Sequence, residues 1–262
     1  MIALKMGLHG RARITAQVKK LAVILKREEK AAIRSWEPSL TRAFESFGNK
    51  IADRFMQVSK RRAVTKKYLD DEEIASEALL IAWAEGDGSV IASSYAGQYL
   101  HVASMTFDAL NTTMNLGVNL TDYMQSAILK TGGRRLGLLD LPQQTKDSLF
   151  NALEKARAEG LGADAMAKII AKEVSAGPWL TAETRAQVIA RTETKYAQNW
   201  SSLEAYRSSE TVTDVLVFDA QLGPTDEECE AINGETVGLE EAMALMESEH
   251  PNGTRSFAPV VS

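Results

Sequence analysis

Residues 184–218 read TRAQVIARTETKYAQNWSSLEAYR followed by SSETVTDVLVF, and the character of the chain changes within them. The first stretch predicts a helix, with Thr181 as its N-cap and Glu183 in its first turn. After Ser208 most residues are β-branched or apolar, a composition typical of a buried strand at 211–218. The chain therefore passes here from helical to mixed structure.

The residues beyond this strand predict a small domain of helices and strands. In chain order we expect a turn at 222–224, a short helix at 225–232, a turn at Asn233-Gly234 and an amphipathic helix at 239–248. A last strand at 257–261 could pair with 211–218, and Pro259 would confine it to an edge of the sheet.

The residues before 184 predict helices. Apolar residues recur at three- and four-residue spacing along 14–25 and again along 40–55, and Pro38 should end the first of these helices near Trp36. Further helices are expected from 70 to 83, at 91–116, at 145–159 and at 162–176, with a glycine-rich basic linker at 131–135. The predicted fold class is a mainly α N-terminal part with a small α+β C-terminal domain. Its expected divisions are a basic helical arm (1–69), a helical middle region (70–139) and an α+β domain (140–262).

The 30 Lys and Arg residues and the 35 Asp and Glu residues of this 262-residue chain are unevenly distributed. Residues 1–67 carry 17 basic and 5 acidic side chains. By contrast, residues 208–262 carry 12 acidic side chains and only Arg255 as a base. This split predicts two surfaces that bind different partners.

The composition excludes several classes of protein. Hydrophobic residues make up 45% and charged residues 25% of the chain, as in folded globular proteins. No apolar run reaches about 18 residues and the N-terminus lacks an apolar signal segment, so we expect neither an integral membrane protein nor a secreted one. Cys229 is the single cysteine, which excludes an internal disulfide and a cysteine-based zinc cage. We expect no cofactor and no metal.

Basic side chains follow the predicted N-terminal helices opposite their apolar stripes. Such a surface could bind nucleic acid, an acidic protein surface or, as the third choice, a membrane surface. The candidate contacts are Lys19, Lys20, Lys26, Arg27, Lys60, Arg61, Arg62, Lys66 and Lys67. If about six phosphates are neutralised, the affinity for DNA should fall roughly a thousandfold between about 50 and 200 mM salt.

Three short motifs occur in order in the C-terminal half of the chain. They are Arg191-Thr192-Glu193 on the predicted helix, Asp219, Asp226, Gly234 and Glu235 around the strand and the following loop, and His250-Pro251-Asn252 near the end. This order resembles the phage Mu F-like family of minor capsid proteins, also called head morphogenesis proteins, over roughly residues 135–262. Many relatives also carry cysteines in the loop and after the His-Pro-Asn element. This chain has Gly253 there instead, so the resemblance implies no metal site here.

The resemblance implies a structural protein of the virion rather than an enzyme. A few copies would lie in or near the portal of a phage head that is assembled in the host cytoplasm. There the protein would act in head assembly, portal association and DNA packaging or delivery. The implied partners are the portal and other capsid or scaffold proteins, and the basic helices could contact packaged DNA.

The motif residues allow a structural and a catalytic interpretation. In the structural one, Arg191 and its neighbours lock the C-terminal domain to the helical part, for example through a bidentate ion pair with Asp219. In the catalytic one, Arg191, Glu193, Asp219 and His250 serve a nuclease or a nucleotide-dependent transferase, with His250 as general base. Arg191 and Glu193 are two positions apart on a helix and cannot easily face one pocket, which favours the structural interpretation.

Cys229 is not expected to be a nucleophile. It lies among Asp226, Glu227, Glu228 and Glu230 in the sequence. Their negative charges disfavour the thiolate, which is the reactive form of the side chain.

Overall fold

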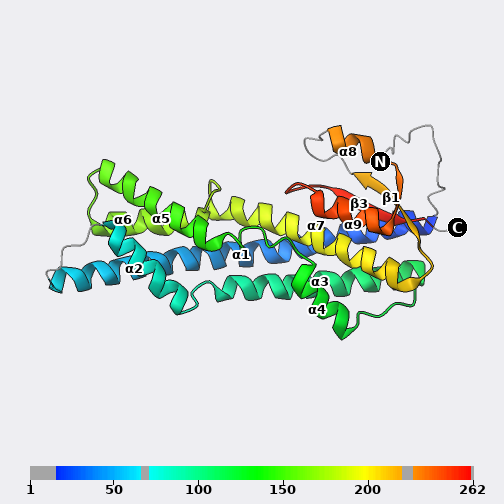
Figure 1. Ribbon diagram of the computed structural model, residues 1–262, viewed down its shortest axis with the longest axis horizontal. Helices are drawn as coiled ribbons and strands as arrows, with labels where there is room; N and C mark the ends of the chain where they lie inside the picture. The colour runs from blue at the N-terminus through cyan, green and yellow to red at the C-terminus, as the bar shows by residue number, and fades with distance from the viewer. Residues whose placement is uncertain (1–15, 66–70, 220–226, 261–262) are drawn as a thin grey trace. The chain divides into compact units, whose positions relative to one another are not determined.

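The computed structural model describes residues 16–65, 71–219 and 227–260 (Figure 1). The helices are α1 (Ala16–Thr65), α2 (Asp71–Ala84), α3 (Ser89–Met114), α4 (Asp122–Thr131), α5 (Leu141–Ala158), α6 (Ala163–Ala176), α7 (Ala182–Ser209), α8 (Glu227–Ile232) and α9 (Leu239–Ser248). The strands are β1 (Asp214–Asp219), β2 (Thr236–Gly238) and β3 (Arg255–Pro259). The predicted fold class, mainly α with a small α+β C-terminal domain, is confirmed.

The three strands form an antiparallel sheet in the order β2-β1-β3. Val215 lies opposite Pro259 and Asp219 opposite Arg255, so the predicted pairing of the two strand segments is confirmed. Pro259 lies on an edge strand, as expected for a residue that cannot donate to a ladder. The central strand β1 is buried at Val215–Val217, which accounts for its continuous apolar run.

The first helix does not end near Trp36 as predicted, because α1 continues through Pro38 to Thr65. Proline lacks the amide hydrogen that would bond to the carbonyl four residues earlier, which costs about 3 kcal/mol in a helix interior. Trp36, Leu40 and Phe44 are buried on the two sides of the proline. Their packing offsets the lost hydrogen bond, as tertiary contacts commonly do for helices.

Several other boundaries differ from the expected ones. α5 begins at Leu141 rather than near Thr145, with Pro142 in its first turn, where no amide donor is needed. α4 and the short strand β2 were not predicted. The predicted turn at 222–224, together with Lys66, Lys67 and Asp226, lies outside the described residues.

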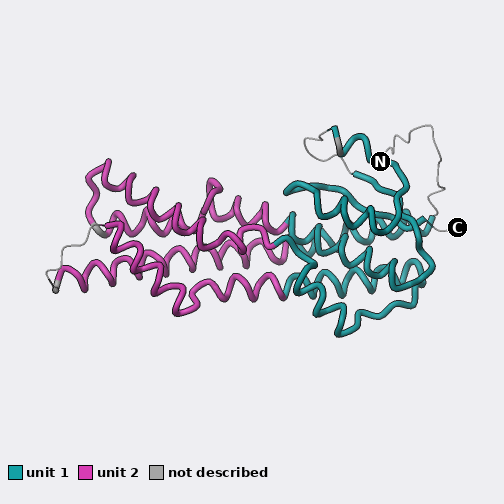
Figure 2. Tube along the Cα trace, in the orientation of Figure 1, with its two compact units in different colours: residues 1–33, 97–134, 191–262 teal, residues 34–96, 135–190 magenta. Residues whose placement is uncertain are grey.

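The chain divides into two compact units (Figure 2). Unit 1 comprises the described residues within 1–33, 97–134 and 191–262, and unit 2 those within 34–96 and 135–190. Three of the four boundaries between them fall inside α1, α3 and α7, and the fourth, at 134–135, falls between α4 and α5. These units cut across the three consecutive divisions expected from the sequence.

Unit 1 has an apolar cluster that joins widely separated segments. Val18 of α1, Leu216 of β1 and Ala258 of β3 are buried against one another. Met114, Phe218 and Val260 are partly buried and pack around them. This cluster attaches the sheet to the first turn of α1.

Unit 2 buries a charged side chain, Arg185 of α7, which is 1% exposed. Its guanidinium lies 3.8 Å from the ring centre of Phe44 and 5.5 Å from that of Trp179. It donates to the carbonyl oxygens of Val174 (3.2 Å), Ser175 (3.4 Å) and Gly137 (3.4 Å) and to Oε1 of Gln144 (3.0 Å). Burial lowers the pKa of Arg185 to about 10, so the side chain stays charged at neutral pH. The guanidinium therefore connects α7 to α6, α5 and the segment before α5 through neutral acceptors.

None of the helices within the described ranges is both long enough and apolar enough to cross a bilayer.

Candidate functional site

The middle of α7 buries an unusual run of polar side chains in unit 1. The buried polar residues are Thr192, Glu193, Thr194, Lys195, Gln198, Asn199, Ser201 and Ser202. Buried polar groups are costly unless they are hydrogen-bonded. Thr192–Asn199 and their hydrogen-bonding partners form what we call the α7 network.

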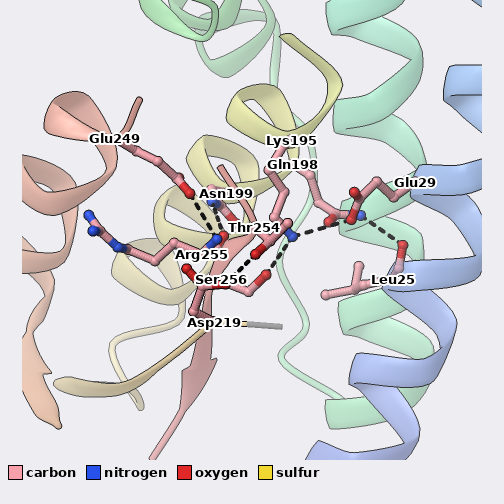
Figure 3. Close-up of polar contacts among 10 residues, drawn as sticks. All are labelled: Leu25, Glu29, Lys195, Gln198, Asn199, Asp219, Glu249, Thr254, Arg255 and Ser256. Atoms are coloured by element: carbon pink, nitrogen blue, oxygen red, sulfur yellow. Dashed lines mark hydrogen bonds and ion pairs between the residues drawn. The ribbon is translucent and has the colours of Figure 1, made fainter. Parts of the chain in front are cut away.

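One side of the α7 network reaches the N-terminal part of α1 (Figure 3). The side-chain amide of Gln198 donates to the carbonyl oxygen of Leu25 at 2.9 Å. Lys195 Nζ lies 3.2 Å from Glu29 Oε2, and both side chains are largely buried. These contacts hold the start of α1 against α7 across more than 160 residues of sequence.

A second side of the network reaches α3. The Tyr99 hydroxyl donates to Glu193 Oε2 at 2.6 Å, and Gln98 Nε2 donates to Thr194 Oγ1 at 3.0 Å. Glu193 is fully buried. A buried carboxylate needs such donors, because an ionised group without partners is strongly disfavoured away from water.

A third side reaches the C-terminal strand and the loop before it. Asn199 Nδ2 donates to the Arg255 carbonyl oxygen at 2.9 Å, and Lys195 Nζ donates to Ser256 Oγ. The amide of Asn252 donates to Thr192 Oγ1 at 3.1 Å. The Arg-Thr-Glu and His-Pro-Asn motifs, about 60 residues apart, therefore contact each other directly.

The expected ion pair between Arg191 and Asp219 is not formed. Arg191 is exposed to solvent. The Asp219 carboxylate instead accepts a hydrogen bond from the hydroxyl of Thr254, next to the β1–β3 pair formed by Asp219 and Arg255. An exposed guanidinium keeps its hydration and gains little from an ion pair. The motif thus joins α7 to the C-terminal segment through Thr192 rather than Arg191.

The other predicted motif residues lie in turns of unit 1. Gly234 has a φ of +94°, a left-handed conformation that favours glycine, and its amide donates to the Val217 carbonyl oxygen at 2.8 Å. His250 and Pro251 are both exposed. His250 Nδ1 lies 3.0 Å from the Pro251 carbonyl oxygen.

An open surface recess lies beside His250. It is lined by Arg134, Thr192, Lys195, Tyr196, Glu249, His250 and Gly253. Arg191, Glu193 and Asp219, which the catalytic interpretation combined with His250, are not in this lining. Of the four residues proposed for catalysis, only His250 faces the recess.

Arg255, which the motif comparison did not select, is a central residue of this region. It is 5% exposed, and its guanidinium donates to the Leu245 carbonyl oxygen at 2.7 Å and to Cys229 Sγ at 3.3 Å. The sequence predicted that carboxylates surround this thiol, but Glu227 and Glu230 are exposed and a guanidinium contacts the sulfur. Arg255 is the only basic residue among the acids of residues 208–262, and this isolation could have marked it in the sequence as a site residue.

The potential metal ligands that the structure describes in this region are Cys229 and His250 with the neighbouring acids. His250 Nε2 lies 3.9 Å from Cys229 Sγ. Across the described ranges, no group of three or more His, Cys, Asp and Glu side chains is placed to hold a metal ion. The guanidinium of Arg255 beside the thiol further disfavours a cation there.

Glu249 is the buried acid of the region. Its Oε1 accepts from the Arg255 amide at 2.8 Å, and its backbone carbonyl accepts from Arg134. Burial raises the pKa of Glu249 above 4.5 and outweighs the opposing effects of the Arg255 amide and of the charges of Lys195 and Arg255, while Asp219 adds to the increase. A Cβ on Gly253 would overlap the Glu249 side chain, so a larger residue there would displace that carboxyl group.

We expect the substitution Glu249→Gln to flatten the pH dependence of stability. The folded protein holds the Glu249 proton more tightly than the unfolded chain. The contribution of this carboxyl to the unfolding free energy is therefore complete below about pH 4.5 and is lost as pH rises through the raised pKa. Glutamine keeps the acceptor for the Arg255 amide and does not ionise. Chemical denaturation should show that the free energy of unfolding of the variant, relative to that of the native protein, is higher at pH 7 than at pH 4.5.

The control for this substitution is Glu247→Gln, at an exposed residue of α9. It should leave the pH dependence of the native protein unchanged. A slope in Glu249→Gln equal to that of the native protein would contradict the assignment.

The predicted basic contacts separate into two groups. In unit 2, Arg61 and Arg62 both pair with Glu77 of α2, and Lys60 is exposed. In unit 1, Lys19 and Lys20 are exposed, Lys26 is half-buried, and Arg27 pairs with Glu28. The charges available to a partner on α1 therefore lie mainly in its first part.

Comparisons with known proteins identify no relative. No protein family, no curated protein and no solved structure matches the chain.

Proposed function

We propose that this protein is a minor capsid protein of a tailed phage, of the Mu F-like type, with a structural role near the portal. The observation that carries the proposal is the hydrogen bond from the Asn252 amide to Thr192 Oγ1. This bond joins the Arg-Thr-Glu and His-Pro-Asn motifs. Such contact is expected if the two motifs belong to one structural element. The proposed place is the phage head, and the proposed partners are the portal and other capsid or scaffold proteins.

The buried character of the motif supports a structural rather than a catalytic role. Thr192 and Glu193 are each committed to a partner within unit 1, Asn252 and Tyr99. Catalytic groups need access to a substrate, whereas Glu193 is fully buried. The network instead fixes the C-terminal strand, α3 and the start of α1 to one helix.

The first part of α1 is proposed to contact packaged DNA. On a helix, residues three and four positions apart are neighbours. The exposed Val23 therefore has Lys19, Lys20, Lys26 and Arg27 around it. Of the two acids of this segment, Glu29 pairs with the buried Lys195, whereas Glu28 pairs with Arg27 and reduces its charge. Lys19, Lys20 and Lys26 are therefore the main cations of this face. The exposed face is consequently cationic, as phosphate binding requires.

We expect the triple substitution Lys19→Gln, Lys20→Gln and Lys26→Gln to weaken DNA binding in a salt-dependent way. Each phosphate contact contributes about 0.9 to the slope of log affinity against log salt, so three lost contacts should make it shallower by about 2.7. Fluorescence anisotropy with a labelled duplex between about 50 and 200 mM salt measures this slope.

The matched control removes the same number of charges from the other part of α1, with Lys60→Gln, Arg61→Gln and Arg62→Gln. Both arginines of this set already pair with Glu77. The control should therefore change the slope by less than about 1. Equal effects of the two triple variants would contradict a specific role for Lys19, Lys20 and Lys26.

The proposed partners can be tested by capture from procapsids with the full-length protein and with a variant of the α7 network, Thr192→Val. This substitution removes the acceptor of the Asn252 amide with little change in volume. Portal protein should be captured by the native chain and less by the variant. A chain that captures no portal or capsid component would contradict the proposed function.

A further inference from the structure

The open recess beside His250 gathers three basic side chains from separate segments of unit 1. Arg134 follows α4, Lys195 lies on α7 and His250 follows α9. Among the lining residues, Glu249 is the single acid. The three residues therefore line one small area of surface, to which Lys195 contributes a largely buried side chain.

No acid within the described ranges neutralises the charge of Arg134. Its guanidinium donates to the backbone carbonyls of Glu249 and, at 3.4 Å, Glu247. Both acceptors are neutral, and Arg134 makes no ion pair with any residue in the described ranges. A guanidinium has five N–H donors in a planar fork, so donors remain for a further acceptor.

The acid of the recess opposes this charge only weakly. The Glu249 carboxylate accepts from the Arg255 amide in the interior of unit 1. Burial also raises the pKa of Glu249, which favours its neutral form. Lys195 Nζ pairs with Glu29 at 3.2 Å, so Arg134 supplies most of the positive charge among the described residues of the recess.

We propose that this recess binds a single phosphate group. Arg134 is the principal ligand, because a guanidinium fork matches the spacing of phosphate oxygens and can donate two parallel hydrogen bonds. Lys195 and His250 are the flanking groups. The site shares no residue with the DNA-binding face proposed on α1, so the two proposals stand or fall separately.

The protein contains its own reporter for this site. It has three histidines, and His250 lines the recess whereas His101 lies exposed on α3 and is not in the lining. The full-length protein is titrated with inorganic phosphate while chloride keeps the ionic strength constant, and the imidazole C–H resonances are followed by NMR. We expect a saturable shift of the His250 resonance and little change at His101.

Substitutions test which residue binds. Arg134→Gln should weaken the apparent phosphate affinity about tenfold or more, as expected for loss of charge-assisted hydrogen bonds. Arg207→Gln, at an exposed arginine near the end of α7, is the matched control and should leave the affinity unchanged. Arg134→Lys keeps the charge without the fork and should give an intermediate affinity. It also serves if Arg134→Gln fails to fold.

Two further ligands test whether the native protein contacts the phosphate group itself. Adenosine 5′-monophosphate should reproduce the His250 shift, and adenosine without a phosphate should not. A saturable shift with adenosine, a phosphate response matched by chloride, or equal affinities in Arg134→Gln and the native chain would overturn the proposal. The comparison of phosphate with chloride decides the question without any variant.

Discussion

Replacing Arg185 with alanine should lower the free energy of unfolding by about 3–5 kcal/mol, the largest effect expected for any single substitution here. The guanidinium is 1% exposed and donates to three backbone carbonyls and to Gln144. Removing it leaves these buried acceptors without their donor and opens a cavity beside Phe44. Chemical denaturation followed by tryptophan fluorescence measures the loss, since Trp179 lies beside the guanidinium.

Two control substitutions make this prediction specific. Arg207→Ala removes an exposed arginine whose partners are Glu204 and Glu240, and should cost less than about 1 kcal/mol. Arg185→Met keeps the volume and the contact with Phe44 but removes the donors. If Arg185→Met were as stable as the native protein, the bonds to the carbonyls would make no net contribution, which would contradict our explanation.

Glu193→Ala should be the second most damaging substitution, with a loss of about 2–4 kcal/mol in the free energy of unfolding. It removes the acceptor of the Tyr99 hydroxyl and creates space in the buried centre of unit 1. Thermal and chemical denaturation of the full chain would measure this loss.

The contrasting substitution is His250→Ala, which distinguishes structural from catalytic use of the motifs. His250 is exposed, so its removal should change stability by less than about 0.5 kcal/mol. If Glu193→Ala instead folds like the native protein while both variants lose a nuclease or nucleotide-transfer activity of the native chain, the enzymatic interpretation is correct.

The sequence predicted correctly those helix ends and strand positions that depend on residues close by in the chain. The Thr184 amide donates to Thr181 Oγ1 at 3.1 Å, as the N-cap prediction required. Gly160 and Gly177 both have positive φ, and they directly follow the helix ends expected at 159 and 176. Pro259 is on an edge strand, as expected for a residue that has no amide hydrogen to donate to a neighbouring strand.

Contacts between distant segments were less predictable. Pro38 was expected to break α1, because the local cost of proline is visible in the sequence whereas the burial of Trp36 and Leu40 is not. In the site, the sequence identified Thr192 and Glu193 but predicted the wrong partner for Asp219. The pairing of Lys195 with Glu29 joins residues 166 positions apart, and no periodicity indicates such a pair.

The cluster of Val18, Leu216 and Ala258 also has a consequence for when unit 1 can fold during synthesis. Its members are separated by up to 240 residues, so the ribosome must add nearly all of the chain after Val18 before Ala258 exists. At about 5–20 residues per second, this interval lasts roughly 12–48 seconds. Throughout it, the apolar stripe at the start of α1 lacks its final covering and is a binding site for chaperones. A C-terminal truncation before β3 should therefore increase chaperone association of the nascent chain through α1, although α1 itself is complete.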